Sequence, residues 1–259
     1  MTSATLPAWP YPRWIAHRGA GKLAPENTLA AFRLGASHGY RMFECDAKLS
    51  ADGVAFLLHD ATLDRTSNGK GVAGDRPWGE LARMDAGRWH SRAYAGEAIP
   101  TLEALARYCL ANGHHLNIEI KPTPGTERAT GEAVALEAAR LWDVGRARAD
   151  ALSAPAVPPL LTSFKTQALE GARATAPQLP RGLLLDSLRS GWLDEARALG
   201  CVAVVCNYAL WDADKVAAVH AAGMRCLSYT VNDESVAAHL LALGTDGIIT
   251  DRVDLFAPD

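Results

Sequence analysis

Two histidines in the sequence each follow a short apolar segment, where an acid–base group would stand at the end of a strand. His17 follows residues 14–16, and His59 follows residues 54–58. The pKa of an imidazole lies near neutrality, so two histidines can divide a pair of proton transfers, one as the base and one as the acid. His17 and His59 are therefore candidate catalytic residues.

Three carboxylates lie at the ends of two other apolar segments. Glu44 and Asp46 end segment 41–47, and Glu119 ends segment 116–120. Because side chains alternate along a strand, Glu44 and Asp46 point the same way. Three carboxylates in one place repel one another, and a divalent cation removes that repulsion. An all-oxygen ligand set favours Mg²⁺ or Ca²⁺ over zinc, so the sequence predicts such a cation here.

Two basic side chains accompany these groups. Arg18 directly follows His17, and Lys121 lies two residues after Glu119 and therefore on the same strand face. A guanidinium offers a planar fork to the non-bridging oxygens of a phosphate, and an ammonium adds a point charge. Together with a cation and two histidines, Arg18 and Lys121 form a set of groups suited to a phosphodiester.

The elements that position these residues follow a repeating pattern of short apolar segments and Ala- and Leu-rich amphipathic segments. Eight strands and the helices between them, in about 250 residues, indicate an α/β (β/α)₈ TIM barrel, in which functional groups collect at the strand ends. An open doubly wound sheet is the alternative, and the lack of a GxGxxG after the first strand argues against its dinucleotide-binding form. The predicted strands are 14–16, 41–47, 116–120, 160–162, 183–185, 202–205, 225–230 and 247–250, and the predicted helices are 27–38, 102–111, 127–141, 165–175, 192–199, 213–222 and 234–243.

One long segment interrupts the repeat. Residues 60–100 are rich in Gly, Arg and Trp and show no helix–strand unit, which is typical of a functional insertion. Before it, Asp52-Gly53 predicts a hairpin that extends the second strand. The Pro-rich segment 153–159 is expected to be a loop, because barrel units continue on both sides. We therefore expect a single barrel domain over residues 1–259 with an insertion at 60–100, after the second strand.

The composition excludes several classes of protein. The chain has 259 residues, 49% of them hydrophobic, and a formal net charge of −3, so no basic surplus favours binding to nucleic acid. The five cysteines are scattered without zinc spacing, which favours reduced thiols. The N-terminal segment lacks the pattern of a signal peptide, and no apolar run is long enough to span a membrane. We expect a cytoplasmic protein with a small-molecule substrate; the sequence makes no prediction of its oligomeric state.

These residues lie in segments that resemble a known family. The segments IAHRGAGKLAPENTLAAF, MFECDAKLSADG, LLHDATLDRTSNGKG, NIEIKP, SYTVND and GTDGIITDR are similar to those of glycerophosphodiester phosphodiesterases, and the match runs from Trp14 to Arg252. The resemblance implies a (β/α)₈ barrel with a small insertion after the second strand. It also implies hydrolysis of glycerophosphodiesters to glycerol 3-phosphate and an alcohol, with a divalent cation.

The resemblance also implies a role for each matching residue. His17 and His59 would be the acid–base pair. Arg18 and Lys121 would hold the phosphate, and Tyr229, where the family often has Trp, would pack against the glycerol. The implied metal ligands are Glu44, Asp46 and Glu119, and Glu26 of the PENT motif would be a residue of the metal shell or an orienting residue.

Other interpretations compete with these. A lysophospholipase-D-type enzyme would use the same chemistry at a membrane, but no apolar entrance or membrane-binding segment is evident. A catalytically inactive barrel would lack a histidine or a metal carboxylate, and all are present. Glu26 could instead cap the helix that begins near residue 27, and Tyr229 could belong to the core.

Several nearby residues have structural interpretations as well. Asn232 could be a helix N-cap or contact the substrate, and Asp246 and Asp251 are expected to serve turns and caps. Cys45 is expected to point away from the site, and Asp64 is expected to form a salt bridge with Arg65. Trp78 and Trp89 could line a substrate channel, but at least one of them is expected to form a small core in the insertion.

Overall fold

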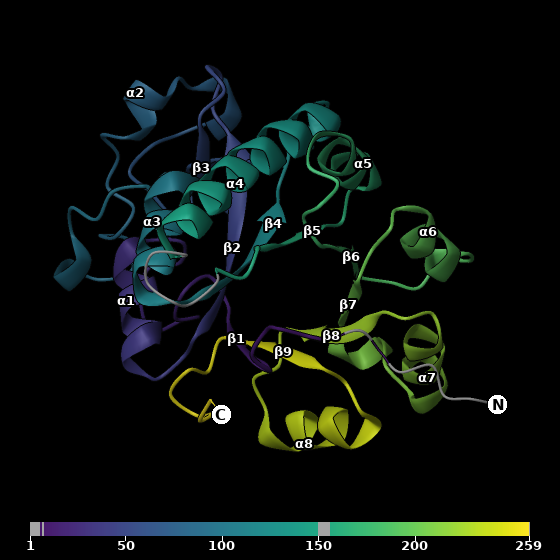
Figure 1. Cartoon of the computed structure of the whole chain (residues 1–259). Helices are drawn as coiled ribbons and strands as arrows, with labels where there is room; N and C mark the ends of the chain where they lie inside the picture. Colours follow the sequence, from purple (N-terminus) through teal and green to yellow (C-terminus); the bar gives the residue numbers. More distant parts are fainter. Residues whose placement is uncertain (1–5, 7, 150–155, 259) are drawn as a thin grey trace.

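Eight parallel strands close into a barrel in the computed structural model, which describes residues 6, 8–149 and 156–258. The barrel closes because β1 pairs with the last strand, β9, as well as with β2 (Figure 1). An open sheet would leave two unpaired edges, so the TIM barrel is confirmed and the doubly wound alternative is wrong. The barrel strands are β1 (Trp14–Ala16), β2 (Met42–Leu49), β4 (His115–Ile120), β5 (Leu160–Ser163), β6 (Arg181–Leu185), β7 (Ala203–Asn207), β8 (Arg225–Tyr229) and β9 (Gly247–Thr250).

Helices connect the strands and surround them (Figure 1). Four of them begin at a capping side chain, that of Thr28, Thr101, Asp212 or Asp233, which accepts a hydrogen bond from the first turn. The third connecting helix, α4, extends eight residues beyond its predicted end. The connecting helices are α1 (Leu29–Ser37), α3 (Leu102–Asn112), α4 (Glu127–Ala149), α5 (Thr166–Thr175), α6 (Trp192–Ala198), α7 (Ala213–Ala221) and α8 (Glu234–Leu243).

The alternation of side chains along each strand divides the core into two layers. On β2, Met42 belongs to the apolar cluster inside the barrel, whereas Phe43, Cys45 and Ala47 belong to the larger cluster between the barrel and its helices. The prediction that Cys45 points away from the site is confirmed. The same alternation turns the acidic residues of β2 toward the barrel interior.

The insertion follows a strand that is added to the edge of β2. This strand, β3 (Ala55–Leu57), is antiparallel to β2, so the predicted hairpin is confirmed. The insertion holds only short elements, η1 (Ala73–Asp75), α2 (Trp78–Leu81) and η2 (Arg92–Tyr94). Of these, η1 and α2 share an apolar cluster with β3, formed by Phe56, Leu58, Leu63, Ala73, Leu81, Ala86 and Ile99, with Trp78 and Met84 packed against it.

The two tryptophans of the insertion therefore differ. Trp78 belongs to the small core, as expected for at least one of the two, whereas the side chain of Trp89 is 39% exposed. The indole N–H of Trp89 donates to the carbonyl of Ala86. Neither residue lines the cavity described below.

The loop between β1 and α1 packs tightly against its neighbours at two glycines. A Cβ atom at Gly21, whose φ is +56°, would lie 2.2 Å from the backbone of Asp251, and one at Gly35 would lie 2.1 Å from the carbonyl oxygen of Gly19. Only glycine allows such approaches. The start of this loop is thereby held between α1 and the segment that follows β9.

Some expectations concern other parts of the chain. Of the predicted loop 153–159, residues 156–159 form neither helix nor strand, and residues 153–155 lie outside the described residues. No helix in the described ranges is long and apolar enough to cross a membrane. The compartment and the lack of a nucleic-acid partner stay predictions.

Candidate active site

A cavity of about 170 Å³ lies at the carboxyl ends of the barrel strands. Seven of the residues singled out in the sequence contribute to its wall, and Asp46 is fully buried beside them. The wall contains both charged and apolar side chains. Its wall is formed by His17, Arg18, Glu44, His59, Asn117, Glu119, Lys121, Thr162, Phe164, Leu184, Tyr229, Thr230 and Ile249.

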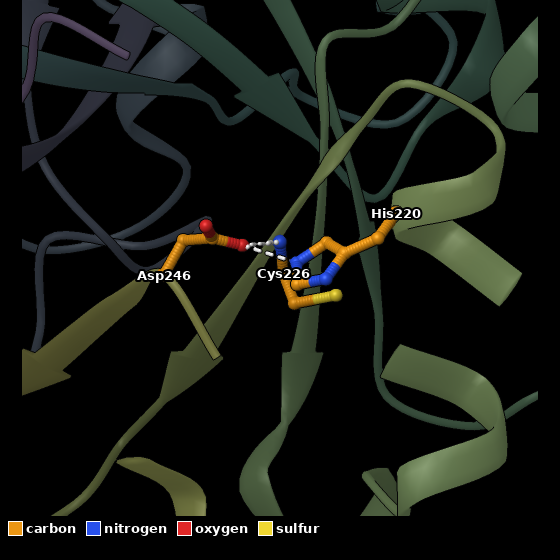
Figure 2. A group of neighbouring side chains, drawn as sticks. All are labelled: His220, Cys226 and Asp246. Carbon is orange, nitrogen blue, oxygen red and sulfur yellow. Dashed lines mark hydrogen bonds and ion pairs between the residues drawn. The ribbon is translucent and has the colours of Figure 1, made fainter. Parts of the chain in front are cut away.

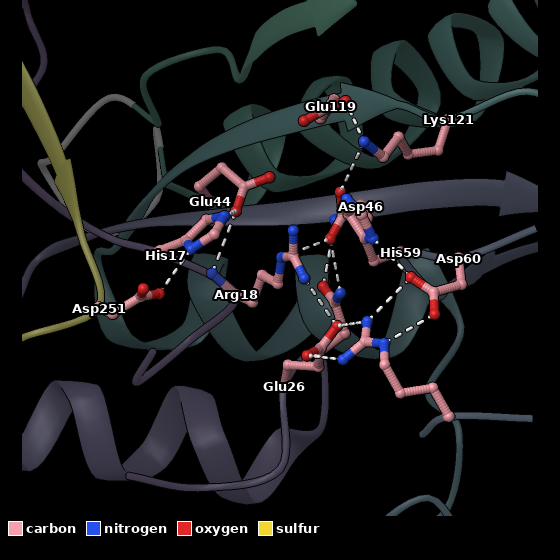
Figure 3. A network of polar contacts seen from close by, with 12 residues as sticks. His17, Arg18, Glu26, Glu44, Asp46, His59, Asp60, Glu119, Lys121 and Asp251 are labelled. Atoms are coloured by element: carbon pink, nitrogen blue, oxygen red, sulfur yellow. Dashed lines mark hydrogen bonds and ion pairs between the residues drawn. The ribbon is translucent and has the colours of Figure 1, made fainter. Parts of the chain in front are cut away.

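The three carboxylates come together as predicted. Asp46 on β2 is in register with Glu119 on β4, and Glu44 lies one inward position earlier on β2. One oxygen from each of the three lies within 4.8 Å of the others, and all three residues are buried (Figure 3). The parallel pairing of β2 and β4 therefore builds a compact group of oxygen atoms.

The electrostatics of this group fit a divalent cation. Burial and the neighbouring charges of Asp46 and Glu119 raise the pKa of Glu44 well above its usual value. Burial, followed by the charge of Asp46, raises the pKa of Glu119 to about 7. Within the described part of the chain, Glu44 Oε1 and Asp46 Oδ1 are buried without a hydrogen-bond partner. Such atoms are costly unless something binds them, and a hard cation is the natural partner for a set of carboxylate oxygens.

Asp46 is the most firmly held of the three. Its Oδ2 accepts from Asn27 Nδ2 at 2.8 Å, its backbone N–H donates to Asn27 Oδ1, and Arg18 Nε lies 3.2 Å from Oδ2. Burial alone would raise the pKa of Asp46, but the charges of Arg18 and Lys121 lower this pKa to about 2. Arg18 and Asn27 are also the two non-glycine residues with positive φ among those described, at 50° and 60°. Backbone strain of this kind collects at functional sites.

Each predicted catalytic histidine is held by a carboxylate through Nδ1. His17 Nδ1 lies 2.7 Å from Asp251 Oδ1, and His59 Nδ1 lies 2.8 Å from Asp60 Oδ1 (Figure 3). A carboxylate can only accept, so each Nδ1 carries the proton and each Nε2 is left to act in the cavity. His17 Nε2 lies 3.8 Å from Glu44 Oε2. Burial lowers the pKa of His59, which favours its neutral ring.

The sequence did not assign these carboxylate partners. Asp251 was expected to serve a turn or cap, but its side chain bonds to His17 and to Asn232 Nδ2. Asn232 in turn accepts the backbone N–H of Asp251, and the N-cap of α8 is Asp233. A signal was present, because Asp251 directly follows a predicted strand, as His17 does.

The two cations of the site are both tied to its acids. Lys121 Nζ lies 2.8 Å from Glu119 Oε1 and 3.8 Å from Asp46 Oδ1. The carbonyl of Lys121 accepts from the buried ammonium of Lys48, and burial lowers the pKa of Lys48 to about 8. Arg18 donates from its backbone to Glu44 Oε2 at 3.1 Å. These contacts keep the positive groups beside the cavity.

Part of the cavity wall is apolar. Phe164 and Tyr229 pack edge to face, and Lys121 Nζ lies 5.4 Å from the centre of the Phe164 ring. The hydroxyl of Tyr229 donates to the carbonyl of Leu185 at 2.9 Å. Tyr229 thus takes part in the packing of the barrel and forms part of the cavity wall, and its contact with the glycerol stays a prediction.

Glu26 lies outside the carboxylate group. Its Oε1 accepts from Arg18 Nη1 at 2.8 Å, and both of its oxygens bond to Arg65. Thr28 caps α1 in its place. The expected salt bridge between Asp64 and Arg65 is wrong, because Asp64 instead accepts the backbone N–H of Gly71 and lies near Lys70.

Another group with the residue types of a metal site lies at the opposite end of the barrel. His220 Nε2 and the backbone N–H of Cys226 both bond to Asp246 Oδ2 (Figure 2). The guanidinium of Arg225 donates to Asp246 Oδ1. The carboxylate is thus already satisfied, and burial raises the pKa of the Cys226 thiol. Asp246 serves the structure here.

A cavity of about 450 Å³ lies next to that group, lined by residues that include Trp9, Arg13, Arg225 and Asp246. It is larger than the first cavity. It contains none of the predicted catalytic, phosphate-binding or metal-binding residues, so size alone does not identify the site.

Comparisons with known proteins agree with this geometry. The model of the glycerophosphoryl diester phosphodiesterase family matches residues 17–255. The Bacillus subtilis protein YhdW is 32% identical over 253 residues, with 95% of this chain and 96% of that protein covered. A glycerophosphodiester phosphodiesterase of Caldanaerobacter subterraneus is 30% identical over 242 residues, with 92% and 93% covered.

A solved structure extends the likeness to three dimensions. A phosphodiesterase from Oleispira antarctica, in complex with the product sn-glycerol-3-phosphate, has a TM-score of 0.85 and 34% identity to this chain, and 93% of each chain is covered. The match of the family model and the similarity of whole chains indicate the same family. This chain belongs to the glycerophosphoryl diester phosphodiesterase family and is a phosphoric diester hydrolase.

Proposed function

We propose that this protein hydrolyses small glycerophosphodiesters to glycerol 3-phosphate and an alcohol. The observation that carries the proposal is the convergence of two carboxylate-held histidines, three buried carboxylates and two cationic side chains at one cavity of about 170 Å³. The Oleispira antarctica relative, whose structure contains sn-glycerol-3-phosphate, supports the identity of the product.

Glu44, Asp46 and Glu119 would hold the divalent cation, which we propose to be Mg²⁺ or Ca²⁺. When bound, the cation supplies Lewis-acid stabilisation of the charge that develops on the phosphoryl oxygens. Asn27 and Arg18 both contact Oδ2 of the Asp46 carboxylate, so Oδ1 keeps one orientation toward the other two carboxylates. The two backbone positions with positive φ are those that supply these contacts.

The two histidines would carry the proton transfers. As the 2-hydroxyl of the glycerol attacks phosphorus, Nε2 of one histidine takes its proton, and Nε2 of the other gives a proton to the leaving alkoxide. The cyclic phosphate that forms is then opened by water with the two roles reversed. Asp251 and Asp60 keep both rings in the tautomer that this exchange needs.

The remaining residues of the cavity would hold the substrate. Arg18 and Lys121 would offer positive charge to the phosphate. Asp46 orients the side chain of Arg18, and Glu119 orients that of Lys121. Tyr229 and Phe164 present an apolar surface against which the carbon chain of the glycerol packs. Glu26 acts on Arg18 as an orienting residue.

Removal of the cation tests the proposal directly. We expect purified protein to release glycerol 3-phosphate from glycerophosphocholine, to lose this activity in EDTA, and to regain it with Mg²⁺ or Ca²⁺. The expectation follows from the unpartnered carboxylate oxygens, which would be left repelling one another beside the phosphate. The product is measured with a coupled glycerol-3-phosphate dehydrogenase assay. Activity that survives exhaustive chelation contradicts the role given to the three carboxylates, and no release with any ion contradicts the reaction.

Asp251→Asn tests the partner of His17. The amide keeps the shape of the carboxylate but loses the charge that fixes the Nδ1–H tautomer, so we expect kcat to fall by roughly tenfold to a hundredfold, part of the usual contribution of an acid–base group. The melting temperature, measured by differential scanning fluorimetry, should change little. Asp254→Asn, an exposed acid three residues later that pairs with Arg252, is the control. A kcat equal to that of the unmodified protein would remove Asp251 from the site.

A further inference from the structure

The guanidinium of Arg65 is bound by a carboxylate on each of two edges. Nη1 and Nη2 donate to the two oxygens of Glu26 at 2.7 and 2.8 Å, and Nε and Nη2 donate to the two oxygens of Asp60 at 2.7 and 2.9 Å. Both contacts are bidentate. Arg65 lies in the insertion, whereas Glu26 belongs to the loop after β1, so the side chain joins two segments that are distant in the sequence.

Each of the two carboxylates also bonds to a residue of the cavity. Glu26 Oε1 accepts from Arg18 Nη1 at 2.8 Å, and Asp60 Oδ1 bonds to His59 Nδ1 at 2.8 Å. Arg65 is thus the middle of a continuous series of contacts from Arg18 to His59. Figure 3 shows the two ends of this series facing the same group of carboxylates.

His59 has more need of such support than His17. It follows the end of β3 and its side chain is 30% exposed, whereas the side chain of His17 is 17% exposed. The carboxylate that holds His59 is itself 27% exposed, and Asp251, which holds His17, is 14% exposed. An exposed carboxylate keeps one orientation only when something else binds it. For Asp60 that group is Arg65.

The charges fit this role. Hydrogen bonds from Arg65 hold the pKa of Asp60 below its usual range, and burial has a smaller, opposite effect. The carboxylate therefore stays an acceptor for His59. The planar guanidinium can serve two carboxylates at a fixed separation, which a lysine ammonium cannot do. Exposed ion pairs contribute little to stability, so the expected effect of Arg65 is on the geometry of the site and not on the fold.

We propose that Arg65 is a positioning residue of this active site, which fixes the Asp60 and Glu26 carboxylates and, through them, the ring of His59 relative to the guanidinium of Arg18. The proposal rests on the proposed function for its effect on rate. It does not rest on that function for its effect on the His59 ring. The insertion thereby completes the site without contributing a residue to the wall of the cavity.

The experiment compares three variants of the full-length protein. Arg65→Ala should lower kcat by about tenfold to a hundredfold, because small displacements of reacting groups have effects of this size. Arg65→Lys should not restore the rate, since it keeps the charge but lacks the fork. Arg76→Ala is the matched control, because Arg76 is an equally exposed arginine of the insertion that pairs with Glu80. Its kcat should be unchanged.

Two further measurements separate positioning from a loss of structure. Because Arg65 is 44% exposed, guanidinium or methylguanidinium at millimolar concentration should enter the space left in Arg65→Ala and raise kcat severalfold, with no such effect on Arg76→Ala. Long-range ¹⁵N–¹H NMR of the histidine rings, with His59 assigned from the His59→Ala spectrum, should show the Nδ1–H tautomer of His59 in the unmodified protein. In Arg65→Ala it should show a mixture of tautomers.

The outcomes are distinct. If Arg65→Ala keeps the tautomer of His59 and its kcat, the proposal is overturned. It is also overturned if both the activity and the melting temperature of the variant fall and no guanidinium compound restores the rate. If the unmodified protein cleaves no glycerophosphodiester, the proposed function fails, and the tautomer of His59 in Arg65→Ala still decides the role of Arg65.

Discussion

His17→Ala and His59→Ala each lower kcat by at least about two orders of magnitude, the usual contribution of a general acid or base. Each histidine has its Nδ1 bound to a carboxylate and its Nε2 left for the cavity, so neither can substitute for the other. The proposed exchange of protons needs both rings in every turnover. The loss should appear in steady-state release of glycerol 3-phosphate at saturating substrate and cation.

The fold should survive both changes, because the side chains line the cavity and neither belongs to an apolar cluster. His239→Ala is the control, since His239 is exposed on α8 and does not line the cavity. Melting temperature and cation binding are measured in parallel. Near-normal rates in both variants would show that the acid–base assignment is wrong, whatever the reaction.

Glu44→Gln abolishes activity and at the same time stabilises the cation-free protein. Burial and the charges of Asp46 and Glu119 raise the pKa of Glu44, so its ionised form is unfavourable in the folded state at neutral pH. For a carboxyl whose folded pKa is raised, stability falls as the pH rises through that pKa. An amide of the same shape carries no charge, so the penalty disappears.

A change of about 1 kcal/mol in the free energy of unfolding shifts the melting temperature of a chain of this length by roughly 2–4 °C. We therefore expect Glu44→Gln to melt a few degrees higher in EDTA and to gain less from added Mg²⁺ or Ca²⁺. The measurement is a cation titration by differential scanning calorimetry.

The control for this variant is Glu137→Gln. Glu137 is half-buried on α4 and burial raises its pKa too, but it has no contact with the site, so its cation titration should match that of the unmodified protein. A Glu44→Gln protein that melts lower than the unmodified protein in EDTA, with an unchanged response to cations, would show that Glu44 is not a ligand.

The barrel could be predicted because its signals are local. Apolar segments of three to six residues, a cap such as Thr28 before a helix and a glycine such as Gly113 after one recur around the chain. The insertion could not be predicted in detail, since its elements are three or four residues long and shorter than the period that would reveal them. The last turns of α4 were missed because the pattern of apolar residues weakens after Leu141.

The contacts of the site likewise divide into some that the sequence predicts and some that it does not. Residues that alternate on one strand, such as Glu44 and Asp46, share a face by geometry alone, and their approach to Glu119 follows from strand order. Pairing between loops has no such rule. Arg65 bonds to Asp60 and Glu26 and not to its neighbour Asp64, because Asp64 closes its own turn onto Gly71. Only the folded chain decides between such partners.

The contact between His17 and Asp251 spans 234 residues, from the end of the first strand to the end of the last. A ribosome delivers the N-terminal end of a chain long before the C-terminal end. His17 is therefore synthesised directly after the first barrel strand, whereas Asp251 is synthesised directly after the last one. This dyad cannot form until the last barrel strand has been synthesised, so a growing chain that lacks this strand carries the three buried carboxylates and a His17 ring without its carboxylate partner.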